Sequence, residues 1–395
     1  MRADAARADR NAAIRGAARS WRRAGAIDGA TLAAIEAEVP DDRVRVGPVF
    51  RVLLFVFTLI AITAAFGFVA MFFGADEEQG VGWLALFWGI ALAVATEVQT
   101  GPLRRAQGGT EAGTSFAMLC FLQGGTAWLL FDFGNLTPDG GTLAFFFGLG
   151  AVLCAAAAWR WGFPLYAAAA MAWLLLALAV APQGRLLWIA VPLALAPVLL
   201  RLSDSPRLPP AHRASCAAAL VVGLAGLYLA VHYGSVESRW VEAMGGRVPL
   251  LEIPVGAVTE FLSRVGTALV PPAFLALGLW RRRRLLLLLG LAAGAASLAT
   301  WYLQAAPAPL WVFLGVCGLV TLAAALAVRR LLDAAPDKER WGFTAEPLFD
   351  DPEAGERLEA AASVVTLTPE ARAAQEPGFK GGGGEFGGGG ASGSW

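Results

Sequence analysis

The sequence predicts an all-α membrane protein, a polytopic bundle of about ten transmembrane helices. Of the 395 residues, 57% are hydrophobic and only 16% are charged, and the mean hydropathy is +0.58. The apolar residues gather in repeated runs of about 18 residues, long enough to cross a hydrocarbon core of roughly 30 Å. The arginines between these runs gather in alternate loops, which is the pattern of a chain that crosses a membrane many times.

Ten apolar runs define the expected spans. Their approximate ranges are 52–73, 81–98, 114–131, 142–159, 163–181, 186–200, 214–233, 261–280, 285–304 and 310–328. The fourth and fifth runs are separated only by a very short turn at Arg160-Trp161, and the sixth run is short. A bundle of eight spans therefore stays open as the alternative.

Four consecutive arginines separate the eighth run from the ninth: Arg281, Arg282, Arg283 and Arg284. Positive charge between spans is retained on the cytoplasmic side, so these arginines are the expected topology determinants. If there are ten spans and both termini are cytoplasmic, the four inner loops carry ten arginines and the five outer loops carry three. We therefore expect a multi-pass protein of the bacterial inner (cytoplasmic) membrane.

The chain divides into three parts by composition. Residues 1–46 predict a small cytoplasmic helical segment, residues 47–330 the transmembrane bundle, and residues 331–395 a cytoplasmic tail. In the first part, Gly25 is expected to end one helix and Asp28 or Thr31 to begin a second.

The arginines of the first helix have two interpretations. Arg15, Arg19, Arg22 and Arg23 either bind a protein partner or lipid headgroups, or lie on a solvated helix and only enforce topology.

The tail is Gly-rich from residue 378 and is expected to be disordered, because it has too few apolar side chains to bury. Phe379, Phe386 and Trp395 are its widely spaced aromatic residues. Two interpretations stay open. The tail is either a tether that carries these residues to a partner or to the bilayer interface, or a low-complexity end without a binding role.

Polar and ionisable residues inside the apolar runs are the candidate functional residues, because such groups cost free energy there. They are Glu97, Gln123, His232, Glu260 and Arg264. Glu260 and Arg264 are four residues apart, so they share a helix face and can pair. Apart from Gln123, these residues lie near span ends, where a structural role at the interface is the alternative.

Prolines and glycines give weaker signals. Pro192, Pro197 and the pair Pro271-Pro272 are expected to interrupt their spans, which either lines a cavity or leaves plain kinks. The segment Gly290–Gly294 has a GxxxG spacing that allows close helix contact, which we assign to packing within the chain.

Several function classes lack support. The formal net charge is zero, which gives no basis for nucleic-acid binding. Two histidines and four cysteines without CxxC spacing predict neither a metal site nor a redox centre. The metalloprotease, P-loop and nucleophile-elbow motifs are absent. No catalytic or cofactor-binding residue is therefore predicted, and enzymatic activity is unsupported.

Three stretches resemble known families. Trp21, Gly25, Ile27 and Leu32, which precede Arg51 and the first span, resemble bacterial membrane proteins of domain-of-unknown-function families 2157 and 4401. That resemblance implies a short soluble helical segment followed by eight to ten spans, and supplies no activity.

The stretch 283–330 looks like the closing span pair of the same families. Separately, the ending FGGGGASGSW is similar to the Gly-rich ends of TPM-domain membrane proteins, although the TPM domain itself is missing.

The leading hypothesis is a membrane scaffold or envelope-associated component that docks a protein partner through its termini. The alternative is a transporter or channel for a small or apolar solute. A cavity lined by Glu97, Gln123 and proline-interrupted spans would favour transport, whereas a filled bundle would favour the scaffold.

Overall fold

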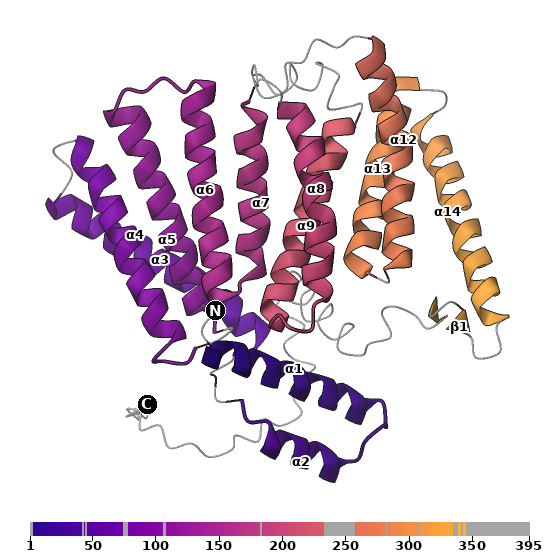
Figure 1. Cartoon of the computed structure of the whole chain (residues 1–395), viewed down its shortest axis with the longest axis horizontal. Helices are drawn as coiled ribbons and strands as arrows, with labels where there is room; N and C mark the ends of the chain where they lie inside the picture. Colours follow the sequence, from indigo (N-terminus) through magenta and orange to yellow (C-terminus); the bar gives the residue numbers. More distant parts are fainter. Residues whose placement is uncertain are drawn as a thin grey trace, which may run out of the picture. The chain divides into compact units, whose positions relative to one another are not determined.

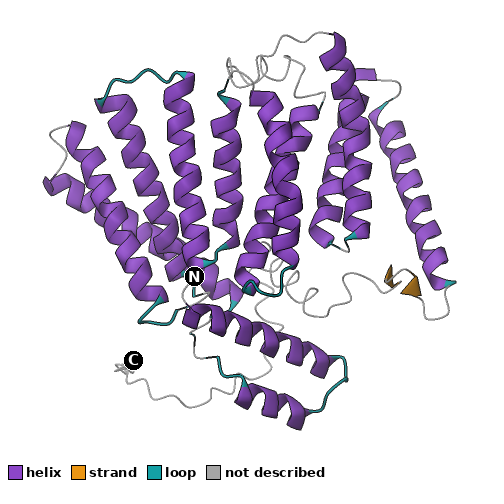
Figure 2. Cartoon of the chain, viewed as in Figure 1, coloured by secondary structure: helices purple, strands orange, loops and turns teal. Residues whose placement is uncertain are grey.

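The computed structural model describes residues 3–41, 43, 46–73, 78–105, 108–181, 184–232, 257–281, 283–305, 309–334, 339–340 and 343–344. Helices make up nearly all of this part of the chain (Figure 2). The elements are α1 (Ala3–Arg23), α2 (Gly29–Glu38), α3 (Pro48–Phe73), α4 (Glu78–Thr100), α5 (Thr110–Ala127), the π-helical η1 (Trp128–Phe133), α6 (Gly140–Trp161), α7 (Pro164–Ala179), α8 (Gly184–Asp204), α9 (Pro210–Val231), α12 (Ala257–Trp280), α13 (Arg284–Ala305), α14 (Leu310–Asp333), β1 (Glu339–Arg340) and β2 (Phe343–Thr344).

The structure falls into two units, residues 1–306 and 307–395. The first contains α1 to α13. The second contains α14 and the two short antiparallel strands β1 and β2, in which Glu339 pairs with Thr344 and Arg340 with Phe343.

The first two helices form a hairpin. Gly25 adopts a left-handed conformation with φ of +73°, which ends α1, and the Asp28 carboxylate then accepts a hydrogen bond of 2.7 Å from the Thr31 backbone N–H. That bond caps α2 and confirms the predicted pair of helices. Ala18 is fully buried, and Arg19 of α1 forms an ion pair with Glu36 of α2 at 2.8 Å.

The bundle of the first unit is built from antiparallel neighbours (Figure 1). α4 packs against α5, α6 against α7, α8 against α9, and α12 against α13, while α7 also packs against α9. The α4–α5, α6–α7, α8–α9 and α12–α13 turns all lie at one end of the bundle, where α1 and α2 also lie. We call this the hairpin end, and the opposite one the far end.

Each of the ten predicted spans has its own helix, which confirms the predicted fold class. Within the described residues, nine of these helices are long and apolar enough to cross a membrane. The tenth, α7, has 16 residues and is about 24 Å long, somewhat shorter than a hydrocarbon core. A bilayer accommodates such a mismatch by local thinning.

Buried apolar residues form two cores. One lies among α4, α5, α6, α7 and α9 and includes Met118, Tyr166 and Met171. The other joins α8 and α9 to α12 and α13 through Leu220, Phe274 and other residues. Many large apolar residues elsewhere on the helices are exposed, as expected of surfaces that face lipid.

Several local predictions are corrected. Arg160 and Trp161 belong to α6, and the turn is made by Gly162, which caps α6 with φ of +77°, and Phe163. α8 is longer than the predicted run 186–200.

The prolines do not unwind their helices, because α8 continues through Pro192 and Pro197, and α12 through Pro271-Pro272, so plain kinks stay the open interpretation. A transmembrane helix tolerates proline where neighbouring groups satisfy the freed carbonyls.

Candidate functional site

Glu97 lies in an ion pair at the hairpin end. Arg160 donates to both carboxylate oxygens, from Nε and Nη2, at 2.6 Å each, and the Trp161 indole donates to Oε1 at 3.0 Å. This bidentate arrangement uses Glu97 to fasten α4 to α6. The side chains of Glu97 and Arg160 are 30% and 41% exposed, so water screens the pair.

Gln123 lies between α5 and α6. Its Nε2 donates to the Phe146 carbonyl at 2.8 Å, while its Oε1 is buried and has no hydrogen-bond partner among the described residues. Gln123 also lines a cavity of about 320 Å³ together with Cys120, Cys154 and Trp173. The structure places neither Glu97 nor the proline-bearing helices α8 and α12 around this cavity.

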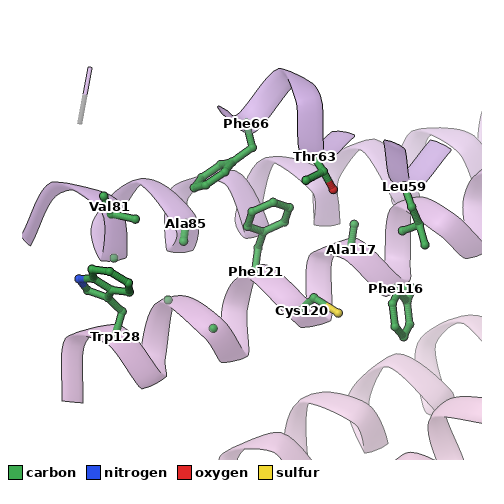
Figure 3. A pocket seen from close by; sticks show the side chains of 13 residues that line it. Leu59, Thr63, Phe66, Val81, Ala85, Phe116, Ala117, Cys120, Phe121 and Trp128 are labelled. Atoms are coloured by element: carbon green, nitrogen blue, oxygen red, sulfur yellow. The ribbon is translucent and has the colours of Figure 1, made fainter. Parts of the chain in front are cut away.

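A second cavity, of about 440 Å³, lies among α3, α4 and α5 (Figure 3). Figure 3 shows Phe66, Phe121 and Trp128 around it, and the Phe66 and Phe121 ring centroids are 4.6 Å apart. Gly124 and Gly125 leave space in its wall. Its lining is almost entirely apolar, with the Cys120 thiol and the Thr63 hydroxyl as polar groups, so it suits an acyl chain or a small apolar molecule.

His232 lies at the far end, next to a polar contact region that the sequence did not indicate. Its Nε2 is 3.0 Å from the Thr300 hydroxyl. Deeper in the bundle, the Tyr228 hydroxyl donates to the Ala293 carbonyl and is 2.8 Å from the Ser297 hydroxyl.

Ser297 in turn donates to the Thr267 carbonyl at 2.7 Å. Tyr228, Ser297 and Thr267 thereby connect α9, α13 and α12, and we call them the hydroxyl contact. A hydroxyl inside an apolar run is a weak signal, because it can also bond to its own helix.

The remaining predicted intramembrane pair is only partly described. Arg264 lies in α12 and makes an interaction with its surroundings, whereas the Glu260 side chain lies outside the described residues. Their pairing therefore stays a prediction.

The arginine cluster also forms ion pairs with another helix of the chain. Arg283 forms an ion pair with Asp204 at the end of α8, and Arg281 approaches the same carboxylate at 3.9 Å. Arg284 begins α13, and Arg282 lies outside the described residues. The cluster thus fastens the α12–α13 turn to the α8–α9 turn.

The hairpin α1–α2 is attached to the bundle by one face of α1. The Asp9 carboxylate accepts a hydrogen bond of 2.8 Å from the Ala211 N–H in the first turn of α9. Arg43, which follows the hairpin, donates to Asp4 at 3.0 Å and to the Thr100 carbonyl at the end of α4 at 2.7 Å.

The opposite face of α1 is open. Ala5 of α1 faces the bundle. Ile14 and Trp21 follow Ala5 by nine and sixteen residues, so their side chains lie on the opposite side of the helix. They are 46% and 51% exposed. Arg7 and Arg10 are exposed on the same side. We call these four residues the outer stripe, and it is the candidate functional site.

Four of the six arginines of α1 fall into two groups. Arg15 donates to the Glu36 and Val39 carbonyls, and Arg19 pairs with the Glu36 carboxylate, so both hold the hairpin together. The outer stripe instead carries Arg7 and Arg10, which sequence reasoning missed because it weighed the arginines without the helix docking that orients them. The predicted tether residues Phe379, Phe386 and Trp395 lie outside the described residues.

Among the described residues, no three His, Cys, Asp or Glu side chains come together as a metal ion requires. Comparisons with models of protein families, with curated proteins and with solved structures return no match. The resemblance to families 2157 and 4401, and that of the tail, stay predictions.

Proposed function

We propose that this membrane protein is a non-enzymatic scaffold of the bacterial inner membrane that docks a protein partner on the cytoplasmic hairpin α1–α2. The observation that carries the proposal is the outer stripe. One face of α1 is fixed to the bundle through Asp9, while the other exposes Ile14 and Trp21 beside two arginines. A large aromatic residue and arginines are the residue types that anchor protein interfaces.

The orientation of the hairpin end supports a cytoplasmic partner. The hairpin-end turns contain Arg104, Arg105, Arg207 and the cluster at 281–284, which the positive-inside rule assigns to the cytoplasm. The outer stripe points away from the bundle, so it is presented to the solvent side. The charges of Arg7 and Arg10 favour a partner segment that carries carboxylates beside apolar side chains.

A photo-crosslinking amino acid at position 21 tests this proposal in living cells. We expect it to capture one protein, whose purified form binds the full chain reconstituted in nanodiscs. Trp21→Glu and Ile14→Glu should each weaken that binding at least about tenfold, because each places a carboxylate in an apolar contact. Ala33→Glu, on the exposed face of α2, is the matched control. Capture of lipid alone would contradict the proposal.

The cavity in Figure 3 favours a second candidate function, the binding of an apolar solute on a transport route. A Cβ atom on Gly124 would meet no atom within 4 Å, so Gly124→Leu adds a bulky side chain at the cavity wall without a backbone clash. Under this alternative, a fluorescent fatty acid binds the native chain and loses affinity for the variant. Equal binding to both would exclude this cavity as the solute site.

A further inference from the structure

A groove of about 550 Å³ lies among α6, α7, α8 and α9, near the hairpin end of the bundle. Val152 and Trp159 of α6 and Leu202 of α8 line it and are exposed, so the groove opens on the outer surface of the bundle. It is hollow because many of the lining side chains are small. They include the alanines Ala151, Ala155, Ala158, Ala167, Ala170 and Ala219.

The groove reaches to the depth of one leaflet of a bilayer. On α6 its lining runs from Trp159, near the end of the helix, back to Ala151, and on α9 from His212, in the first turn, to Ala219. At 1.5 Å per residue these stretches are about 12 and about 10 Å long. Half of a hydrocarbon core is roughly 15 Å thick. The groove therefore lies at the level of the acyl chains in the leaflet of the hairpin end.

An aromatic pair marks the hairpin end of the groove. The rings of Trp159 and His212 stack with centroids 5.4 Å apart. Ser215, one turn deeper, donates to the Ala211 carbonyl of its own helix, so its hydroxyl needs no further partner. Tryptophan gathers at the boundary between hydrocarbon and water. The headgroup of a lipid in this groove would therefore lie beside Trp159 and His212.

Arginines without a partner lie at the same end. None of the three arginine side chains of the α8–α9 turn has an ion pair or a hydrogen bond with another described residue, and the Arg213 Nε is buried as well. Each of them directly neighbours a lining residue in the sequence: Arg201 beside Leu202, Arg207 beside Leu208, and Arg213 beside His212.

The carboxylates nearby do not offset these arginines. Asp204, the acidic residue of the turn, pairs with Arg283 and lies 3.9 Å from Arg281. Asp9 of α1 accepts a hydrogen bond from the Ala211 N–H at the start of α9. The α8–α9 turn therefore keeps an excess of positive charge at the headgroup end of the groove.

From the depth of the groove and this charge, we infer that the groove binds an anionic phospholipid of the hairpin-end leaflet. An acyl chain lies along the alanines, and the phosphate lies at the arginines of the α8–α9 turn. Arginine recognises phosphate through several N–H donors, and basic sites between transmembrane helices bind anionic headgroups. The inference does not depend on the protein partner proposed above.

Native mass spectrometry of the full chain in an uncharged detergent tests this inference. The probes are phosphatidylglycerol and phosphatidylcholine with identical acyl chains. We expect phosphatidylglycerol to bind at least about tenfold more tightly, because only its headgroup carries a net negative charge. Ala155→Phe places a ring in the groove from an exposed position and leaves every charge in place, so it should weaken this binding at least about tenfold. Arg207→Gln removes one guanidinium and should weaken it about fivefold.

Two variants are matched controls. Ala156→Phe adds the same ring at an exposed residue of α6 that does not line the groove, and Arg10→Gln removes an exposed arginine of α1. Both should bind phosphatidylglycerol as the native chain does.

Equal affinity of the native chain for the two lipids would overturn the inference, as would equal binding of phosphatidylglycerol by the two phenylalanine variants. A dimer without bound lipid that Ala155→Phe dissociates would assign the groove to a second copy of the chain and would also overturn it. Arg207→Gln keeps the test decisive if Ala155→Phe fails to fold, because Arg207 is exposed in a turn.

Discussion

The hydroxyl contact among α9, α12 and α13 and the contacts at the hairpin end join helices by different chemistry. In the interior of the bundle, Tyr228, Ser297 and Thr267 meet through neutral groups. At the hairpin end, Glu97 meets Arg160 and Asp204 meets Arg283 through full charges. A hydroxyl can donate to its own helix when a partner is lost, whereas a charge needs water or a counter-charge. These two charged pairs lie at an end of the bundle where their side chains stay partly exposed to water.

The largest expected effect comes from close packing in the interior. A Cβ atom on Gly290 would lie 2.8 Å from the Leu275 side chain and 2.9 Å from its backbone N, whereas one on Gly294 would lie 3.9 Å from Pro271. Gly290→Ala should therefore lower the free energy of unfolding by ~1–3 kcal/mol. Gly294→Ala should stay within about 0.5 kcal/mol of the native chain. Denaturant titration in detergent measures both, and equal effects would refute tight packing at Gly290.

A smaller loss is expected at the hydroxyl contact. Tyr228→Phe removes the bond to the Ala293 carbonyl and should lower the free energy of unfolding by about 1 kcal/mol. Thr126→Val is the control, because the Thr126 hydroxyl donates to Leu122 of its own helix. Denaturant titration in detergent measures the free energy of unfolding of both variants. A control that loses as much as Tyr228→Phe would argue against an interhelical role for the tyrosine.

The ion pair at the hairpin end should contribute less and depend on salt. Both side chains are about a third exposed, so Glu97→Gln is expected to cost less than about 1 kcal/mol, and less still at high ionic strength. Thermal unfolding at low and high potassium chloride measures this difference. Tyr228→Phe, measured in parallel, should show no salt dependence, and an equal salt dependence of the two variants would remove the contrast between the regions.

The smallest effect is expected in the hairpin itself. Hydrogen bonds from Thr31 hold the pKa of Asp28 below its usual value of 3.8. A depressed pKa means that the cap stabilises α2 above pH 3.8 and that this contribution is lost as the pH falls through the lowered pKa. Hydrogen exchange in α2 should therefore accelerate in that acidic range. Asp28→Asn retains a capping side chain and should remove this pH dependence, so an unchanged pH profile would contradict the assignment.

The number and order of the membrane helices could be predicted because long apolar runs and loop arginines are local signals. The helix boundaries near Arg160 and Arg201 were less accurate, since Gly162 caps α6 after Trp161 and α8 continues to Asp204. The sequence could not decide between a broken span and a plain kink at the prolines, because helix continuity depends on neighbouring groups that a single run does not reveal.

The candidate site was only partly predictable. The sequence indicated a basic hairpin, but the assignment of Arg15 and Arg19 to its interior depends on Glu36, which lies on the second helix. The exposure of Ile14 and Trp21 depends on which face of α1 meets α9. Such contacts join residues up to about two hundred positions apart, as between Asp9 and Ala211. Local periodicity carries no information on them.

The proposed scaffold requires that α1 docks on the bundle by the face that carries Ala8, and crosslinking tests this docking most directly. In a cysteine-free background, Ala8→Cys and Ala214→Cys place two thiols at the same cavity, between α1 and the bundle. A short bifunctional thiol reagent applied to native membranes should join them rapidly. The pair Ile14→Cys and Ala214→Cys, with Ile14 on the opposite face, should react far more slowly. Equal reaction of both pairs, or none with the first, would contradict the docked hairpin.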